Sequence, residues 1–170
     1  MAAIPGFMPN FADMETVFLV VGKTTDRHLA ALIDDYEARS RRYAPFKTEY
    51  IPELKNAGAI SPAEQKTREG QLIAARLREG DCVVLLDEHG RELRSVELAA
   101  WLGRKMQASI RRLVFVVGGP YGFSPEVYSR ADEKLSLSRL TFSHQMVRLL
   151  FVEQFYRAMT ILRGTPYHHE

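Results

Sequence analysis

The sequence predicts one α/β domain, built from a mainly parallel sheet with helices on both faces. Short apolar runs alternate with longer amphipathic stretches along the chain, and such alternation is typical of strands joined by crossover helices. Size agrees with one domain, because 170 residues of which 46% are hydrophobic suffice for a single core. We find no internal repeat, linker or low-complexity tract that would divide the chain.

The first half of the pattern contains two strands and two helices. Val17–Val21 is a continuous apolar run, as expected of a strand covered on both faces. Residues 26–43 place apolar side chains at helical spacing, and Phe46–Ile51 follows as a second strand. A second helix begins after Ser61, with proline at its first position, and is expected to end at Gly80.

The second half continues the alternation. Cys82–Asp87 is a strongly apolar third strand, and a helix begins at Ser95. Leu113–Val117 is a fourth strand, which ends abruptly in a glycine-rich segment. A short helix then begins after Ser124, again with proline at its first position.

The chain ends in an alternating segment and a long helix. Leu135–Leu140 alternates leucine with polar residues, and a helix spans 144–163. At the other end, residues 1–13 contain two prolines and no Lys or Arg, so they resemble neither a secretory signal nor a transit peptide. We interpret 1–13 as a disordered extension and 14–170 as the single domain.

Composition excludes several classes of protein. The net charge of +2 permits a nucleic-acid partner without requiring one. No apolar run approaches the ~20 residues of a membrane-spanning helix. A single cysteine, Cys82, cannot form an internal disulfide, which favours a cytoplasmic protein, and we interpret this thiol as a core residue. No His, Cys, Asp or Glu cluster has zinc-like spacing, so no metal is expected.

Three segments are expected at the carboxyl ends of strands, where open parallel sheets bind ligands. They are Leu85–Gly90, Gly118–Gly122 and Leu137–Phe142. The glycines do not fit a phosphate-binding loop, because Pro120 lacks an N–H donor and no Walker-type lysine follows. They form either a tight turn alone or the wall of a site for an adenosyl compound without phosphates. S-adenosyl-L-methionine is such a compound.

Five motifs in order make the chain similar to one family. The similarity runs from Val17 to the last residue, and its specificity comes from the order and spacing of the motifs rather than from any one of them. The motifs are Val116–Gly122, Leu135–Thr141, His144-Gln145-x-x-Arg148, Glu153-Gln154-x-Tyr156-Arg157-Ala158 and Pro166–Glu170. Together they resemble the ribosomal large-subunit pseudouridine N3-methyltransferases, which belong to the SPOUT class of knotted RNA methyltransferases.

The resemblance implies a fold, a partner and a cofactor. It implies a C-terminal deep trefoil knot, which chain-connectivity rules treat as a rare exception. It also implies a homodimer that binds S-adenosyl-L-methionine in the knot and methylates N3 of a pseudouridine in 23S ribosomal RNA, free or in the assembled ribosome. Gly119 and Gly122 would shape the turn that admits the cofactor. The cofactor contacts carried over by position are Leu86, Gly118, Leu137, Ser138, Arg139, Leu140, Thr141 and Phe142.

Methyl transfer from a sulfonium needs alignment of donor and acceptor and loss of the imide proton. We assign catalytic roles to Glu153, Arg157 and His168, with His168 contacting the uracil edge or accepting its proton. Tyr167 could stack on a base, and His169 lies beside it. Two simpler readings stay open, a surface ion pair between Glu153 and Arg157 and a mobile, solvated C-terminal tail.

Two further residues of the motifs are assigned to the substrate, His144 and Arg148. Arg148 falls within the apolar arc of the last helix, where an unpaired guanidinium would be costly. It therefore meets a carboxylate across a subunit interface or binds an anionic group of the RNA.

Two basic clusters are either solvated helix faces or RNA-docking surfaces. The clusters are Arg39, Arg41, Arg42 and Lys47, and Arg104, Lys105, Arg111 and Arg112. The same surfaces support an alternative function, a non-catalytic ribosome- or RNA-binding module. A nucleotide-binding enzyme of another α/β class is disfavoured by the missing phosphate motifs.

Overall fold

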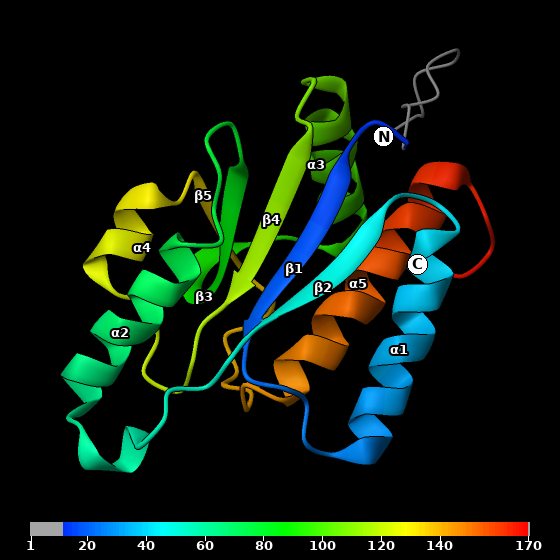
Figure 1. Ribbon diagram of the computed structural model, residues 1–170. Coiled ribbons are helices and arrows are strands. Elements are labelled where there is room, and N and C mark those ends of the chain that lie inside the picture. The colour runs from blue at the N-terminus through cyan, green and yellow to red at the C-terminus, as the bar shows by residue number, and fades with distance from the viewer. Residues whose placement is uncertain (1–11, 170) are drawn as a thin grey trace.

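The structure, a computed structural model, describes residues 12–169. It contains one five-stranded sheet of order β2-β1-β4-β3-β5, in which every pair of neighbouring strands is parallel (Figure 1). The strands are β1 Glu15–Val21, β2 Phe46–Ile51, β3 Cys82–Glu92, β4 Arg112–Val117 and β5 Glu133–Ser136. The helices are α1 Arg27–Arg41, α2 Pro62–Ala74, α3 Ser95–Gln107, α4 Pro125–Arg130 and α5 Met146–Arg163, with a 3₁₀ turn η1 at Ala57–Ala59.

Alternate side chains of the central strands enter two cores, one on each face of the sheet. Phe18 of β1 packs with α1, α3 and α5, which cover one face. Leu19, the next residue, packs with α2 and α4 on the opposite face. Both faces of β1 and β4 are therefore apolar, as their continuous hydrophobic runs predict. The predicted α/β class and parallel sheet with two helical layers are confirmed.

The helix caps follow the sequence signals. Ser61 Oγ accepts a hydrogen bond from the Glu64 N–H at 3.1 Å, and Asp26 accepts from the N–H groups of His28 and Leu29. A C-terminal cap is seen in α5. This helix ends before Gly164, whose φ of +65° is the left-handed conformation that favours glycine. These contacts fix where each helix begins or ends and so where the adjoining loops start.

Three element boundaries differ from the predicted ones. Helix α2 ends at Ala74, before Gly80, and β5 retains only the beginning of the predicted 135–140 segment. Strand β3 continues beyond Asp87, because after an irregularity at 86–91 its end pairs again with β5. Gly90 makes this irregularity possible, since a Cβ there would lie 2.6 Å from the Leu135 backbone.

After β5 the chain crosses the carboxyl ends of the other strands. It leaves the sheet edge beside β3 and reaches the end of β1, where the Gln145 side chain accepts from the Thr25 N–H at 3.0 Å and donates to the Lys23 carbonyl at 3.2 Å. Helix α5 then runs back between α1 and α3 (Figure 1). This crossing segment forms one wall of the site described below. The trefoil knot itself stays a prediction.

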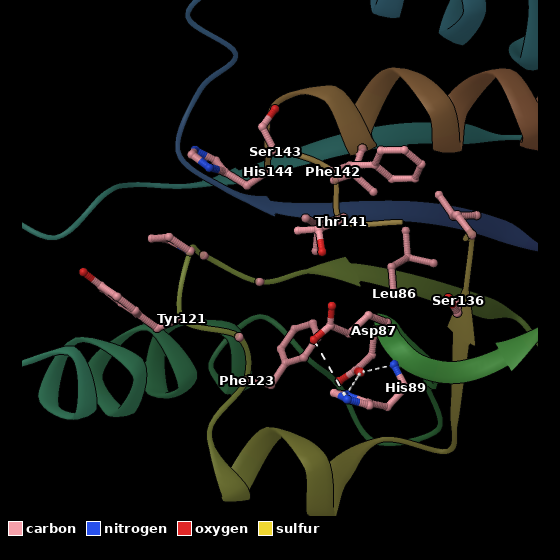
Figure 2. Close-up of a pocket in the computed structure, with 18 of the residues that line it drawn as sticks. Leu86, Asp87, His89, Tyr121, Phe123, Ser136, Thr141, Phe142, Ser143 and His144 are labelled. Atoms are coloured by element: carbon pink, nitrogen blue, oxygen red, sulfur yellow. Dashed lines mark hydrogen bonds and ion pairs between the residues drawn. The ribbon is translucent and has the colours of Figure 1, made fainter. Parts of the chain in front are cut away.

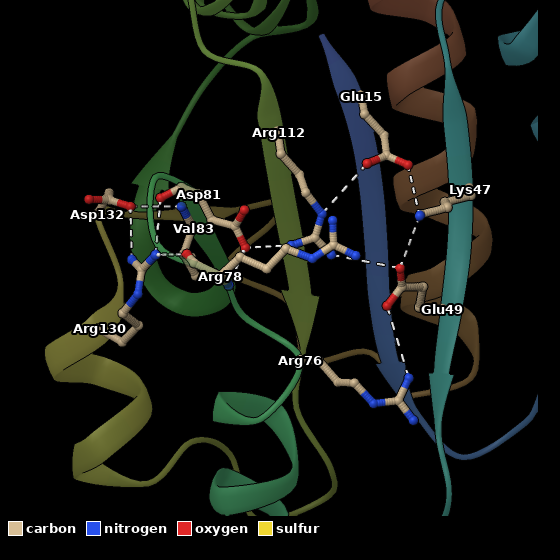
Figure 3. A network of polar contacts seen from close by, with 10 residues as sticks. All are labelled: Glu15, Lys47, Glu49, Arg76, Arg78, Asp81, Val83, Arg112, Arg130 and Asp132. Carbon is tan, nitrogen blue, oxygen red and sulfur yellow. Dashed lines mark hydrogen bonds and ion pairs between the residues drawn. The ribbon is translucent and has the colours of Figure 1, made fainter.

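The amino end of the sheet carries a network of charges (Figure 3). Arg112, at the start of β4, forms ion pairs with Asp81, Glu15 and Glu49. Its side chain is only 8% exposed, so the prediction that Arg112 belongs to a basic surface is wrong. The pattern misleads here because a buried arginine at a strand start looks like any other basic residue until its acidic partners are known.

The proposed extension, 1–13, lies outside the described residues except for Ala12 and Asp13. Met14, the next residue, is buried in the core under α1, α3 and α5. Cys82 is a free, buried thiol whose pKa burial raises, in agreement with its interpretation as a core residue. Within 12–169, none of the helices combines the length and hydropathy that crossing a bilayer requires.

Candidate functional site

A pocket of about 680 Å³ opens at the carboxyl ends of β3 and β4. Its walls come from the irregular part of β3 after Leu86, the Gly118–Gly122 loop after β4, and the 136–144 segment that leaves β5 (Figure 2). Its volume lies within the ~300–1,000 Å³ range of small-molecule sites. The convergence of the three predicted segments on one cavity is thus confirmed.

Most of the residues predicted to contact a cofactor line this pocket, and the exception is Arg139. Its side chain is 88% exposed and pairs with Glu92 at 2.7 Å, and Arg139 does not appear among the lining residues. The predicted residues that do line it are Leu86, Gly118, Leu137, Ser138, Leu140, Thr141 and Phe142. His144, predicted to contact substrate, also borders the cavity.

The glycine-rich loop is a tight turn as well as a wall of the pocket. Gly122 has a φ of +77° and donates its N–H to the Gly119 carbonyl at 3.2 Å. This closes a turn in which the main chain itself faces the cavity. The two readings of the glycines, turn or ligand site, are therefore compatible.

The titratable groups around the pocket include two acids. Asp87 and Glu88 line it together with one lysine, Lys66. Burial would raise the pKa of Asp87, but hydrogen bonds from the Tyr128 hydroxyl and the His89 N–H outweigh it and hold that pKa below its usual value. Burial and the Asp87 carboxylate raise the pKa of Tyr128 to about 12. An ionised Asp87 disfavours phosphates here and is compatible with a cationic ligand.

Arg148 is buried and bonded to main-chain carbonyl oxygens. Its guanidinium donates to the carbonyls of Val21 at 2.7 Å, Gly22 at 2.9 Å and His144 at 3.1 Å. It is 2% exposed, and burial lowers its pKa. The expectation that it pairs with a carboxylate or an RNA anion is thus not what the structure gives. Arg148 instead ties the start of α5 to the end of β1.

The residues given catalytic roles gather on the outer side of α5. The Arg157 Nε donates to Glu153 Oε1 at 3.1 Å, and the Tyr167 hydroxyl donates to the same oxygen at 3.1 Å. Arg157 Nη1 lies 3.4 Å from His168 Nδ1 and stacks its guanidinium over the Tyr167 ring at 4.7 Å. Burial and the hydroxyl of Tyr36 raise the pKa of Tyr167.

This cluster does not border the pocket of its own chain. None of Glu153, Arg157, Tyr167 and His168 is a lining residue. His169 is exposed beside them. The tail is therefore docked on α5 and α1 as far as the chain is described, and the sequence alone did not reveal this position.

Some lining residues were missed by the sequence analysis. Lys66 comes from α2 and Tyr128 from α4, and Ser136 and Val147 flank the predicted 137–142 segment. The local sequence around a helical residue such as Lys66 does not indicate that it lines a pocket, because the tertiary fold decides which helix packs behind which loop. Within 12–169, no group of three or more His, Cys, Asp and Glu side chains could hold a metal ion.

The comparison with known proteins gives a family. A sequence model described as "Predicted SPOUT methyltransferase" matches residues 14–168. The chain belongs to this SPOUT methyltransferase family.

Individual relatives agree with the family match. "Ribosomal RNA large subunit methyltransferase H" of Bacteroides fragilis is 57% identical over 157 residues, covering 92% of this chain and all of that protein. The protein of the same name from Christiangramia forsetii is 50% identical over 155 residues, covering 91% and 99%. The SpoU methyltransferase AviRb from Streptomyces viridochromogenes, solved with AdoMet, is 14% identical with a TM-score of 0.42; the match covers 92% of this SPOUT chain and 62% of that one.

Proposed function

We propose that this protein transfers a methyl group from S-adenosyl-L-methionine to N3 of a pseudouridine in large-subunit (23S) ribosomal RNA. The observation that carries the proposal is the convergence of three separate segments on one pocket at the carboxyl end of the sheet. The SPOUT family match and the names of the relatives support methylation of ribosomal RNA. The motifs quoted above supply the choice of pseudouridine N3.

The pocket suits the methyl donor chemically. Main-chain groups of Gly118 and the 137–142 segment, with apolar walls such as Leu86, fit an adenosyl group without phosphates. Ionised Asp87 favours the positive charge of a sulfonium. When bound, the donor supplies a methyl group that is already electrophilic, so the protein need only align the acceptor and manage its proton.

The tail cluster is assigned two tasks, which are to accept the N3 proton and to contact the extruded pseudouridine. As N3 forms its bond to the methyl carbon, the carbon–sulfur bond breaks, sulfur keeps the electron pair, and the N3 proton passes to a base, for which we propose His168. Arg157, which is held by its ion pair with Glu153, lies beside this imidazole and meets the RNA backbone. Tyr167 and His169 contact the extruded base, and His144 meets it at the pocket.

The separation of this cluster from the pocket of the same chain supports a homodimer. In such a dimer, the tail of a second copy would complete the site. Arg148 acts in this scheme as a positioning residue for the His144 segment rather than as an RNA ligand. The enzyme acts in the cytoplasm, on free ribosomal RNA or on the assembled ribosome.

A strain lacking the gene tests the activity. Mass spectrometry of its ribosomal RNA should show one pseudouridine without its N3 methyl group, and this chain should restore the modification. Calorimetry of the wild-type protein should show binding of S-adenosyl-L-methionine and S-adenosylhomocysteine. The proposal would be contradicted if the well-folded protein bound neither compound and the RNA of the deletion strain were unchanged. The alternative of an RNA-binding module would then fit better.

Deletion of residues 167–170 tests the tail. It removes the proposed base and the stacking ring, so methylation should fall by about a hundredfold or more. Cofactor affinity should stay within about twofold, because no tail residue in 167–169 lines the pocket. Full activity of the truncated protein would refute the tail's role.

A further inference from the structure

The carboxylate of Glu69 is buried directly behind the glycine-rich wall of the pocket. Glu69 lies on α2 and is 4% exposed. A Cβ added to Gly119 would overlap this carboxylate, so only the bare main chain of Gly119, a lining residue, separates the charge from the cavity. The next residue, Gly70, packs against Ser124 in the same way and brings α2 close to the loop.

Glu69 is only partly satisfied by the described part of the chain. Its Oε1 accepts a hydrogen bond from Gln65 Nε2 at 2.9 Å. Its Oε2 is buried and has no hydrogen-bond partner among residues 12–169. A buried carboxylate with one unpaired oxygen is unfavourable unless a positive charge or a further donor reaches it. No step of the methyl transfer described above uses this group.

The ligand proposed for the pocket changes its charge during the reaction. S-adenosyl-L-methionine carries a sulfonium, whereas S-adenosylhomocysteine is a neutral thioether at the same position. A negative charge in a low-dielectric wall therefore acts on the two compounds differently. Neutral contacts, such as those of Leu86 or the main chain of Gly118, do not distinguish them by charge.

From these observations, and resting on the proposed function, we infer that Glu69 is a specificity-determining residue that favours the cationic methyl donor over its neutral product. It acts through the wall, because the absence of a side chain at Gly119 lets the Glu69 carboxylate lie directly against the main chain of that wall. Loss of the sulfonium charge on transfer removes the attraction and so assists release of S-adenosylhomocysteine. Asp87 adds to the same field from the opposite loop.

The test is the ratio of two dissociation constants. Calorimetry of Glu69→Gln should show S-adenosyl-L-methionine binding weakened about tenfold, with S-adenosylhomocysteine changed by less than about twofold. Sinefungin, which bears an ammonium in place of the sulfonium, should follow the methyl donor. Glu64→Gln removes the same charge from an exposed position of α2, where Glu64 pairs with Arg68, and should leave the ratio unchanged.

The possible outcomes separate the inference from the function. Equal weakening of both ligands by Glu69→Gln would assign Glu69 to loop shape alone and overturn the inference, as would no change in either. If Glu69→Gln does not fold, Glu69→Asp withdraws the charge by one methylene and should lower the ratio about threefold; an unchanged ratio would again overturn the inference. Failure of the wild-type protein to bind either ligand would instead contradict the proposed function.

Discussion

The two ends of the same sheet differ in the groups that they contain. At the amino end, Arg112 sits between acids from three directions, and Arg130 donates to the carbonyls of Arg78 at 3.0 Å and Asp81 at 3.1 Å (Figure 3). At the carboxyl end, glycines and main-chain groups surround an open cavity (Figure 2). The amino end pairs charged side chains with one another, and the carboxyl end leaves main-chain groups facing a cavity.

The difference separates stability from binding. A buried ion pair is strongly destabilising to break, because the remaining charge is left without a partner. An open pocket contributes little to stability, so its residues can serve ligand binding instead. Substitutions at the amino end should therefore change mainly the free energy of unfolding, and those at the carboxyl end should change mainly affinity.

The largest effect on stability is expected for Asp81→Ala. Its carboxylate is 2% exposed and pairs with Arg112, which would keep only Glu15 and Glu49, at 3.6 and 3.7 Å. We expect a loss of about 3 kcal/mol in the free energy of unfolding, measured with urea. Cofactor affinity of the folded variant should stay the same. A loss below about 1 kcal/mol would show that the network does not hold the amino end together.

The largest effect on affinity is expected for Gly119→Ala. The new methyl group would overlap the buried Glu69 carboxylate, so the wall of the pocket must shift. Binding of S-adenosyl-L-methionine, followed by calorimetry, should weaken about tenfold, the equivalent of ~1.4 kcal/mol. Gly58→Ala is the matched control, because a Cβ there meets nothing within 4 Å. Unchanged affinity in Gly119→Ala would place the ligand elsewhere.

A smaller, pH-dependent effect is expected for Asp87→Asn at the pocket. Because the pKa of Asp87 is lowered in the folded state, its ionised form stabilises the fold above the unfolded pKa of ~3.9. That contribution, about 1 kcal/mol, is lost as the pH falls through the lowered pKa. Urea midpoints of wild type and variant should differ most at neutral pH, and the difference should shrink progressively as the pH falls below about 4. A difference in urea midpoint that stays constant across this pH range would show that ionised Asp87 does not stabilise the fold.

The smallest effect is expected for Arg76→Ala, which removes an exposed charge at the edge of the same network. Arg76 lies 4.0 Å from Glu49 with 43% of its side chain exposed. Its removal should change the free energy of unfolding by less than about 0.5 kcal/mol. A loss comparable to that of Asp81→Ala would contradict the distinction drawn between buried and exposed members of the network.

The strands and the site segments were predictable from local sequence. The continuous apolar runs in β1 and β4 identify buried parallel strands, and Gly118 marks where β4 gives way to a loop that lines the pocket. The pocket-lining segments near 86, 118 and 137 were identified from the rule that parallel sheets bind ligands at the carboxyl ends of their strands. Those features depend on residues close together in the chain.

Long-range partners were not predictable. Arg148 bonds to a carbonyl 126 positions away, at Gly22, and Arg112 pairs with acids from β1 and β2. Glu69 faces the glycine-rich wall from a helix whose pattern shows only amphipathicity. The tertiary path sets these contacts, so hydropathy periodicity cannot distinguish a buried, bonded charge from a solvated one.

The most direct test of the account is a titration of the isotope-labelled protein with S-adenosyl-L-methionine, followed by amide NMR. The account predicts that shift changes concentrate at 86–90, 118–122 and 137–144, and that the amide of Arg112 at the opposite end stays unperturbed. Saturating ligand without changes in those three segments, or with changes centred on the amino end, would contradict it.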